Sequence, residues 1–301
     1  MVQNVRMRIV VAGTSGFLGK YLVSKLNDDG HEVVRLVRRQ ALRPDEIHWD
    51  PYGSEFDSGI VGGAGAVINL CGATVAGKRW TPAYKEEIRA SRIVPTEVLS
   101  RAVAETGVPV LLNASAAGWY GDSGDRDVDE FAPHGPDFLA TMCRDWEAAT
   151  EAASAAGVRV VKLRTANVLS ADSMLVEKLR PLFRLGLGGK FGTGRQYLPW
   201  ITLHDWLAAV DWLLTFSVSG PVNLSAPETV TNAEFTTAFA AALNRRARLT
   251  LPGPVLKLIG GEGGAELLHG HRMVPKVLVG NGFEFTHGTL EQAMKYTFAV
   301  R

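Results

Sequence analysis

The sequence predicts an α/β protein with a doubly wound parallel sheet of the Rossmann type and a smaller carboxyl-terminal lobe. Two observations support this prediction. Short apolar runs rich in Val, Ile and Leu alternate with longer amphipathic stretches through the first half of the 301 residues. The first of these runs leads directly into glycines at positions 13, 16 and 19, a spacing typical of a turn between a strand and a helix.

The glycine turn predicts a dinucleotide-binding site, against the alternative of an ordinary glycine-rich turn. Gly13 allows a sharp exit from the strand, Gly16 lets the backbone approach a pyrophosphate, and Gly19 lets the helix pack closely on the sheet. The unpaired N–H groups and partial positive charge at the start of the helix then face the phosphates. The residues of the turn expected to contact the cofactor are Gly13, Thr14, Ser15, Gly16, Phe17, Leu18 and Gly19.

The other elements follow from the same alternation. The helix after the glycine turn is amphipathic and stops at Gly30, and a later helix begins with a capping threonine and a proline, Thr81 and Pro82. Strands are expected at 8–13, 32–37, 65–70, 108–114 and 158–164, and helices at 17–29, 81–106 and 136–156. After about residue 168 we expect a glycine-rich stretch, a helix near 203–216, a strand near 221–224 and a helix near 231–244.

This pattern divides the chain into two parts. We expect residues 1–168, completed by about 200–226, to form the nucleotide-binding domain, and residues 169–199 and 227–301 to form the smaller lobe. Ligands of such sheets bind outside the carboxyl ends of the strands, so the substrate is expected between the two parts.

The composition is typical of a soluble globular protein, with 46% hydrophobic and 21% charged residues. A net charge of +1 argues against nucleic-acid binding. The two cysteines, Cys71 and Cys143, indicate a reducing compartment, and no secretion signal is evident, so we expect a cytoplasmic protein. The uncharged segment 58–77 contains six glycines and is expected to be loop and buried strand rather than a membrane span.

The end of the second predicted strand indicates which nucleotide is bound. In this fold an acid at that position bonds the ribose 2′-hydroxyl, whereas an arginine pairs with a 2′-phosphate. The strand ends in Arg38 and Arg39, and no acid follows until Asp45. We therefore expect NADP(H) rather than NAD(H), the alternative being that both arginines are simply solvated.

Several further segments carry a family resemblance. They read VINLCGA over 67–73, RWTP over 79–82, IRASRI over 88–93, NASAAGWYG over 113–121, CRDWE over 143–147, GRQYLPWI over 194–201 and PVNLSAP over 221–227. With them the chain resembles the extended and atypical short-chain dehydrogenase/reductases, and within these the epimerase family, related to nucleotide-sugar epimerases. The tail from Leu251, including GHRMVPK over 270–276, resembles the short carboxyl-terminal domain of that subgroup.

The resemblance implies further contacts to the cofactor. Residues at the end of the fourth strand would lie beside the adenine and diphosphate, and those at the end of the fifth beside the nicotinamide. The first set is Asn69, Leu70, Cys71 and Gly72, and the second is Asn113, Ala114 and Ser115. For Asn69 the alternative is a buried amide satisfied by the backbone.

Members of this superfamily typically use a tyrosine as acid/base, a lysine four residues later that lowers its pKa, and a serine or threonine. Ser115 is the candidate for the serine. Alignment on Glu147 places Leu139 and Cys143 at the tyrosine and lysine positions. Tyr120 is a candidate substitute, with aromatic packing in a turn as the alternative.

Three residues in loops directed at the cleft are candidates for substrate contact: Arg79, Trp80 and Arg195. The alternative is that the arginines are solvated. The acidic turn at 122–130 is expected to be solvated, and no metal site is expected because His269 and His271 lack ligand partners at suitable spacing.

Two functions remain open at this stage. The first is an NADP(H)-dependent oxidoreductase or epimerase acting on a small polar substrate, such as a sugar nucleotide or another anion, without the usual tyrosine–lysine pair. The second is a non-catalytic NADPH-binding sensor or regulatory protein. A homodimer through the helices at 81–106 and 136–156 is expected by family analogy alone.

Overall fold

The structure is a computed structural model that describes residues 6–53, 56–76 and 78–299. Its centre is a parallel sheet of seven strands in the order β11-β7-β5-β4-β1-β2-β3. The strands are β1 (Arg8–Ala12), β2 (Glu32–Val37), β3 (Glu46–His48), β4 (Ala66–Asn69), β5 (Val110–Ala116), β7 (Arg159–Thr165) and β11 (Gly220–Leu224). This arrangement confirms the predicted fold class.

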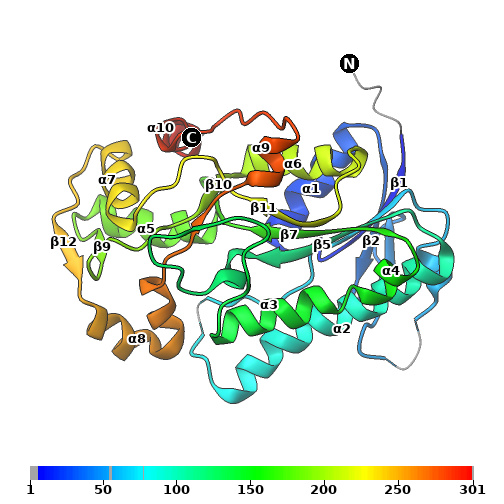
Figure 1. Ribbon diagram of the computed structural model, residues 1–301. Helices are drawn as coiled ribbons and strands as arrows, with labels where there is room; N and C mark the ends of the chain where they lie inside the picture. Colours follow the sequence, from blue (N-terminus) through cyan, green and yellow to red (C-terminus); the bar gives the residue numbers. More distant parts are fainter. Residues whose placement is uncertain (1–5, 54–55, 77, 300–301) are drawn as a thin grey trace.

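Helices cover both faces of the sheet (Figure 1). One face carries α1 (Phe17–Asp28) and α6 (Leu203–Thr215), and the other carries α2 (Pro82–Thr106), α3 (Phe138–Ala148) and α4 (Glu151–Ala155). The alternation of side chains along β1 builds both cores, because Ile9 packs in the cluster that contains Leu22 of α1 and Val10 packs in the cluster that contains Leu99 of α2. Burial on both faces explains why the strands are almost continuously apolar.

The signals that limit α2 act as the sequence predicts. The Thr81 hydroxyl accepts a hydrogen bond from the Tyr84 backbone, Pro82 occupies the first turn, and Gly107 ends the helix with φ of 69°. The predicted helix over 136–156 is instead two helices, because α3 ends at Ala148 and α4 begins at Glu151.

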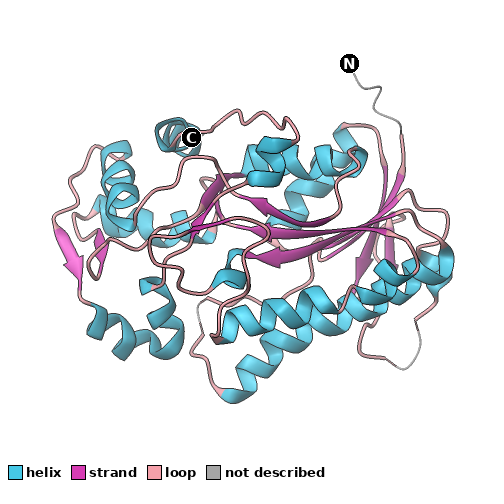
Figure 2. Ribbon diagram, viewed as in Figure 1, coloured by secondary structure: helices cyan, strands magenta, loops and turns pink. Residues whose placement is uncertain are grey.

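The smaller lobe lies beyond the carboxyl ends of β5 and β7 (Figure 2). Its core contains aromatic side chains, with ring centroids 4.8 Å apart for Phe183 and Phe239. Its elements are α5 (Met174–Arg184), β9 (Gly189–Phe191), α7 (Asn232–Ala242), β12 (Leu249–Leu251) and α8 (Gly253–Ala265). The short strands β8 (Asn167–Leu169) and β10 (Trp200–Thr202) pair with each other on the way into and out of this lobe.

The last part of the chain, residues 270–299, is called here the C-terminal strap, because it contacts both parts of the molecule. Its β13 (Arg272–Met273) pairs with β6 (Asp127–Val128), and α9 (Lys276–Gly280) and α10 (Leu290–Ala299) follow. Leu278 packs into the core between the sheet and α1, whereas Met294 packs into the core of the smaller lobe.

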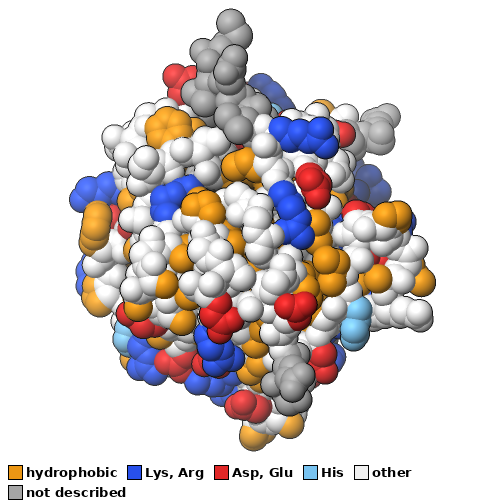
Figure 3. Space-filling view, turned by 90° about the vertical axis from the view of Figure 1, so that its right-hand side faces the viewer, with side chains coloured by type: hydrophobic (Ala, Val, Ile, Leu, Met, Phe, Trp, Pro, Cys, Tyr) orange, Lys and Arg blue, Asp and Glu red, His pale blue; other side chains and the backbone are white. Residues whose placement is uncertain are grey.

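Figure 3 shows the end of the molecule opposite the smaller lobe, where blue and red side chains are scattered and do not gather by sign. This agrees with the low net charge of +1. Within residues 6–53, 56–76 and 78–299, the structure contains no helix of the length and apolar character needed to span a membrane.

Candidate dinucleotide-binding site

The turn between β1 and α1 requires glycine at two of its positions. Gly13 has φ of +84°, and a Cβ atom there would lie 2.5 Å from the carbonyl carbon of Leu70. A Cβ atom on Gly19 would lie 2.4 Å from the Gly13 carbonyl oxygen. The turn therefore packs directly against the loop after β4, and α1 packs directly against the turn.

Gly16 differs from the other two glycines because its α-carbon faces open space. A Cβ atom there would have one neighbour, the Gly13 carbonyl oxygen, at 3.4 Å. Gly16 is also the N-cap of α1 and supplies no side-chain hydrogen bond to the first turn, which contains no acidic residue. The N–H groups at the start of α1 are thus available to an anion from outside the helix.

A cavity of about 670 Å³ opens in front of this turn. Its wall combines the glycine turn, the ends of β2 and β4, and the first half of α2. The lining residues are Gly13, Thr14, Ser15, Gly16, Lys20, Arg35, Leu36, Val37, Arg38, Arg39, Trp49, Pro51, Tyr52, Leu70, Cys71, Gly72, Ala73, Glu87, Ser91 and Pro95. Six of the predicted cofactor contacts are not among the described residues that line the cavity: Phe17, Leu18, Gly19, Asn69, Asn113 and Ala114.

The structure separates the roles of Arg38 and Arg39. Both terminal guanidinium nitrogens of Arg39 donate to the carboxylate of Glu46, each at 2.7 Å, and the Glu46 side chain is fully buried. Within the described part of the chain, Arg38 has no hydrogen-bond or ion-pair partner, and it lines the cavity as an exposed side chain. One cation therefore remains available to a ligand at the end of β2.

Asn69, which ends β4, and Asn113, in the middle of β5, bond to each other instead of facing the cavity. The Asn69 side-chain amide donates to the Asn113 side-chain oxygen at 2.7 Å and to the Thr96 hydroxyl at 2.9 Å. Both asparagines are fully buried, and the Asn69 side-chain oxygen accepts from the Cys71 backbone. This is close to the alternative of a satisfied buried amide, and it fixes the loop that carries Cys71 onto the cavity wall.

Ser115 belongs to a buried network of charged groups. Its hydroxyl donates to a carboxylate oxygen of Glu147 at 2.7 Å. The same carboxylate forms a bidentate ion pair with Arg164, with N–O distances of 2.8 and 3.0 Å. The Ser115 hydroxyl is therefore oriented by α3, and its hydrogen is already donated.

The Tyr120 side chain is buried, and its hydroxyl has two partners. It donates to the Asn223 side-chain oxygen at 2.6 Å and accepts from Arg164 at 3.1 Å. Burial raises the pKa of Tyr120 to about 12, and the neighbouring Arg164 only partly opposes this. These contacts favour the packing alternative, because an acid/base at neutral pH needs a pKa near neutrality.

Leu139 and Cys143 lie on the face of α3 that covers the turn after β5. A Cβ atom on Gly118 would lie 3.2 Å from the Leu139 Cβ and 3.8 Å from the Cys143 sulfur. Burial raises the pKa of the Cys143 thiol to about 12, so it stays neutral. These two positions of α3 carry neither a phenol nor a cation.

Of the three predicted substrate contacts, two lie at the boundary with the smaller lobe. A Cβ atom on Gly261 would lie 3.3 Å from the Arg79 side chain, and one on Gly263 would lie 3.1 Å from Trp80. Lys85 pairs with Glu262 beside them at 2.5 Å, a contact that sequence spacing could not indicate. Arg195 is exposed, and its backbone N–H donates to the Thr193 hydroxyl.

A model of the NAD dependent epimerase/dehydratase family matches residues 9–225 of the sequence. The chain belongs to this family. A second model, for a domain of unknown function (DUF1731), matches residues 251–297. The family predicted from the sequence is therefore confirmed, and the second match covers all of α8 and nearly all of the C-terminal strap.

Relatives of this epimerase-family chain match it along nearly its whole length. Epimerase family protein Mb2239 of Mycobacterium bovis is 47% identical over 290 residues, which are 96% of each chain. The crystal structure of human epimerase family protein SDR39U1 (isoform 2) with NADPH is 30% identical, covers 98% of this chain and 100% of the human chain, and has a TM-score of 0.88. A nucleoside-diphosphate sugar epimerase from Corynebacterium glutamicum is 32% identical with a TM-score of 0.81, over 98% of this chain and 59% of that one.

Proposed function

We propose that this chain binds NADPH in the cavity in front of the glycine turn. The main observation is that Gly16, the uncapped start of α1 and Arg38, which has no partner among the described residues, all face the same cavity of about 670 Å³. A diphosphate fits the first two features, and a 2′-phosphate fits the third. The relative crystallised with NADPH supports the choice of nucleotide.

Different residues of the cavity would bind different parts of the cofactor. The backbone of Gly13 to Gly16 would hold the diphosphate, and Arg38 would hold the 2′-phosphate, with Tyr52 on the same wall. The loop after β4, carrying Leu70, Cys71 and Gly72, would lie against the adenosine half. When bound, the nicotinamide supplies a hydride donor or acceptor.

We propose further that any reaction proceeds without the tyrosine–lysine pair. The substrate would be small and polar, such as a sugar nucleotide or another anion, and would enter beside Arg79 and Trp80, where the sheet domain meets α8. This would make the chain an NADP(H)-dependent oxidoreductase or epimerase with an unusual proton donor.

A specific observation favours a second candidate, binding of NADPH without turnover. Both groups predicted to exchange a proton are already held by the fold: Ser115 donates to Glu147, and the Tyr120 hydroxyl is buried between Asn223 and Arg164. The position where the family has its lysine carries Cys143, a neutral buried thiol. Such a protein would report the NADPH concentration to a partner.

Two measurements test these proposals in order. Calorimetric titration with NADPH and NADH should show at least about tenfold tighter binding of NADPH, because charge-assisted bonds to a phosphate contribute about 1.5–3 kcal/mol. Absence of NADPH binding would overturn both functions. Oxidation of NADPH with any member of a panel of carbonyl compounds and sugar nucleotides would establish an enzyme, whereas tight binding without oxidation across the panel would favour the sensor.

A further inference from the structure

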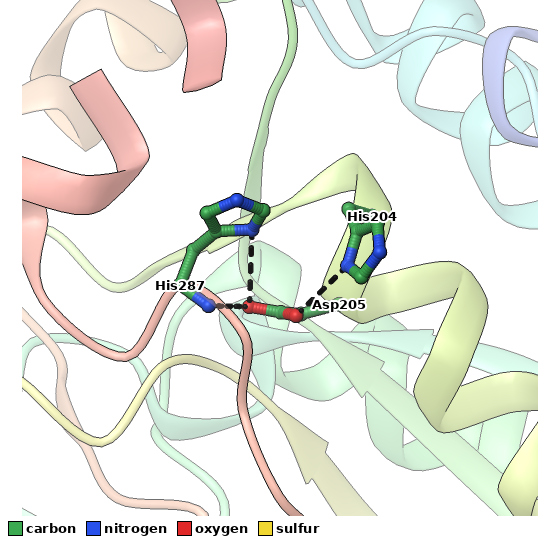
Figure 4. A group of neighbouring side chains, drawn as sticks. All are labelled: His204, Asp205 and His287. Carbon is green, nitrogen blue, oxygen red and sulfur yellow. Dashed lines mark hydrogen bonds and ion pairs between the residues drawn. The ribbon is translucent and has the colours of Figure 1, made fainter. Parts of the chain in front are cut away.

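A group of three side chains that do not line the cavity lies where the start of α6 meets the C-terminal strap (Figure 4). His204 and Asp205 are in the first turn of α6, and His287 precedes α10. Figure 4 shows the Nδ1 atoms of both imidazoles directed at the carboxylate between them. One donor atom from each residue lies within 4.8 Å of the other two.

The Asp205 carboxylate is a buried charge with few compensating cations. Its side chain is 1% exposed, and its ion-pair partners among the described residues are His204 and His287, neither of which has a fixed charge. Two backbone N–H groups, of Thr286 and His287, donate to its oxygens at 3.0 and 2.9 Å. These bonds orient the carboxylate, but they leave a negative charge and further lone pairs facing the two imidazoles.

Two donor-atom distances in this group are close to the spacing between neighbouring ligands of a tetrahedral metal site. The Nδ1 atom of His204 lies 3.2 Å from one carboxylate oxygen, and that of His287 lies 3.7 Å from the other. Metal–ligand bonds of about 2.0–2.1 Å place neighbouring ligands of a tetrahedron about 3.3 Å apart. Small rotations of these side chains would therefore bring all three donors to one ion.

The imidazole of His287 is held in place by its surroundings. Its ring lies 4.6 Å from the ring of Tyr296 and 5.2 Å from that of His204. The Thr202 hydroxyl lies 3.3 Å from the His287 Nδ1, so this nitrogen has a weak protein partner that an ion would displace. The His204 side chain is 49% exposed, which gives an ion a route from solvent.

We propose that His204, Asp205 and His287 form a binding site for a divalent metal ion of the ligand preference of Zn²⁺. Two imidazole nitrogens and one carboxylate oxygen favour Zn²⁺ over Mg²⁺ or Ca²⁺, which prefer oxygen ligands. Water would complete the tetrahedron from the exposed side of His204. The ion would tie the start of α6 to the C-terminal strap, and 82 residues separate Asp205 from His287 in the sequence.

The test uses the full chain freed of metal with a chelator and then titrated with Zn²⁺ against a chromogenic competitor. We expect one tight site per chain and a Tm that rises with Zn²⁺. His204→Gln and His287→Gln should each weaken Zn²⁺ binding strongly. Loss of an outer-sphere partner typically weakens metal binding by about 10- to 100-fold, and loss of a direct ligand should weaken it by more. Neither variant should show a zinc-dependent rise in Tm, and Co²⁺ should give tetrahedral absorption bands only with the wild-type site.

His269→Gln is the matched control, because Asp137, Glu266 and His269 form a second group with three donor atoms within 4.8 Å of one another. This variant should bind Zn²⁺ as the wild type does. Circular dichroism and the zinc-free Tm establish that each variant is folded. Absence of a stoichiometric site in the wild type would overturn the proposal. So would Zn²⁺ binding that is unchanged in both His204→Gln and His287→Gln, or Zn²⁺ binding that is lost in His269→Gln.

Discussion

The guanidinium of Arg164 lies 2.8 and 3.0 Å from the two carboxylate oxygens of Glu147, and both side chains are buried. This pair joins β7 to α3, and it also receives the Ser115 hydroxyl from the end of β5. The Arg164 guanidinium lies 3.8 Å from the centre of the Trp119 ring as well. One ion pair therefore organises the region beside the predicted nicotinamide position.

Glu147→Ala should lower the free energy of unfolding by about 3–5 kcal/mol, because it leaves the buried Arg164 charge without its partner. Asp145→Ala on the same helix is the control, since Asp145 pairs with Arg89 near the surface and should cost about 1 kcal/mol or less. Urea unfolding measures both. Equal losses in the two variants would contradict the importance assigned to the buried pair.

Arg38→Ala should weaken NADPH binding by about 10- to 100-fold and leave NADH binding nearly unchanged, because only the 2′-phosphate is lost as a partner. Arg39→Ala should instead lower Tm, since it removes the bidentate partner of the buried Glu46. Calorimetric titration with both nucleotides separates these effects. If Arg38→Ala weakened both nucleotides equally, the assignment to the 2′-phosphate would be wrong.

Gly16→Ala should abolish tight NADPH binding while keeping the fold, because the new methyl group points into open space where the diphosphate must approach. The backbone of Gly16 has φ of −72°, which alanine adopts without strain. Gly19→Ala, unlike Gly16→Ala, should lower Tm, since its Cβ atom would meet the Gly13 carbonyl oxygen at 2.4 Å. Thermal melts and NADPH titration are compared for the two variants, and unchanged NADPH affinity in Gly16→Ala would place the diphosphate elsewhere.

The pH dependence of stability should reveal the ion pairs of Glu46. Hydrogen bonds from Arg39 lower the pKa of Glu46 from its ordinary value of 4.5 to about 2. A lowered pKa stabilises the fold fully above pH 4.5, and this contribution is lost as the pH falls toward 2. The difference in Tm between the wild type and Glu46→Gln should therefore be largest near neutral pH and shrink between pH 4.5 and about 2. A difference that stays constant over this range would contradict the ionised pair.

Tyr120→Phe should lower the free energy of unfolding by about 1–3 kcal/mol, because the Asn223 side chain and Arg164 lose a buried partner. NADPH affinity should not change, since the hydroxyl is directed into the core. Urea unfolding and nucleotide titration measure the two quantities. If a substrate is found, loss of turnover in a stably folded Tyr120→Phe would restore this tyrosine as the acid/base.

The sequence predicted the features that depend on neighbouring residues. The alternation of strands and helices follows from burial on both faces of the sheet, and the glycine turn is specified within seven residues, Gly13 to Gly19. The three-residue strands β9 and β12 were not predicted, because each is too short to show a period and the two pair across the smaller lobe.

Site residues that depend on distant contacts were harder to predict. Arg39 pairs with Glu46 because the chain returns along β2 at β3, which brings Glu46 beside Arg39. Predicting the hydrogen bond between Asn69 and Asn113 requires knowing that β4 and β5 are neighbours in the sheet. Likewise, the grouping of His204 with His287 exists only because the C-terminal strap returns to α6, so local spacing gave no indication of a metal site.

The C-terminal strap also has a consequence for folding. Because Leu278 belongs to the core of the sheet domain and Met294 to that of the smaller lobe, detaching the strap would expose apolar surface in both places at once. Neither part can then open fully without weakening the other. Heat should therefore melt the protein in one cooperative step, with equal calorimetric and van't Hoff enthalpies, although the chain carries two family domains.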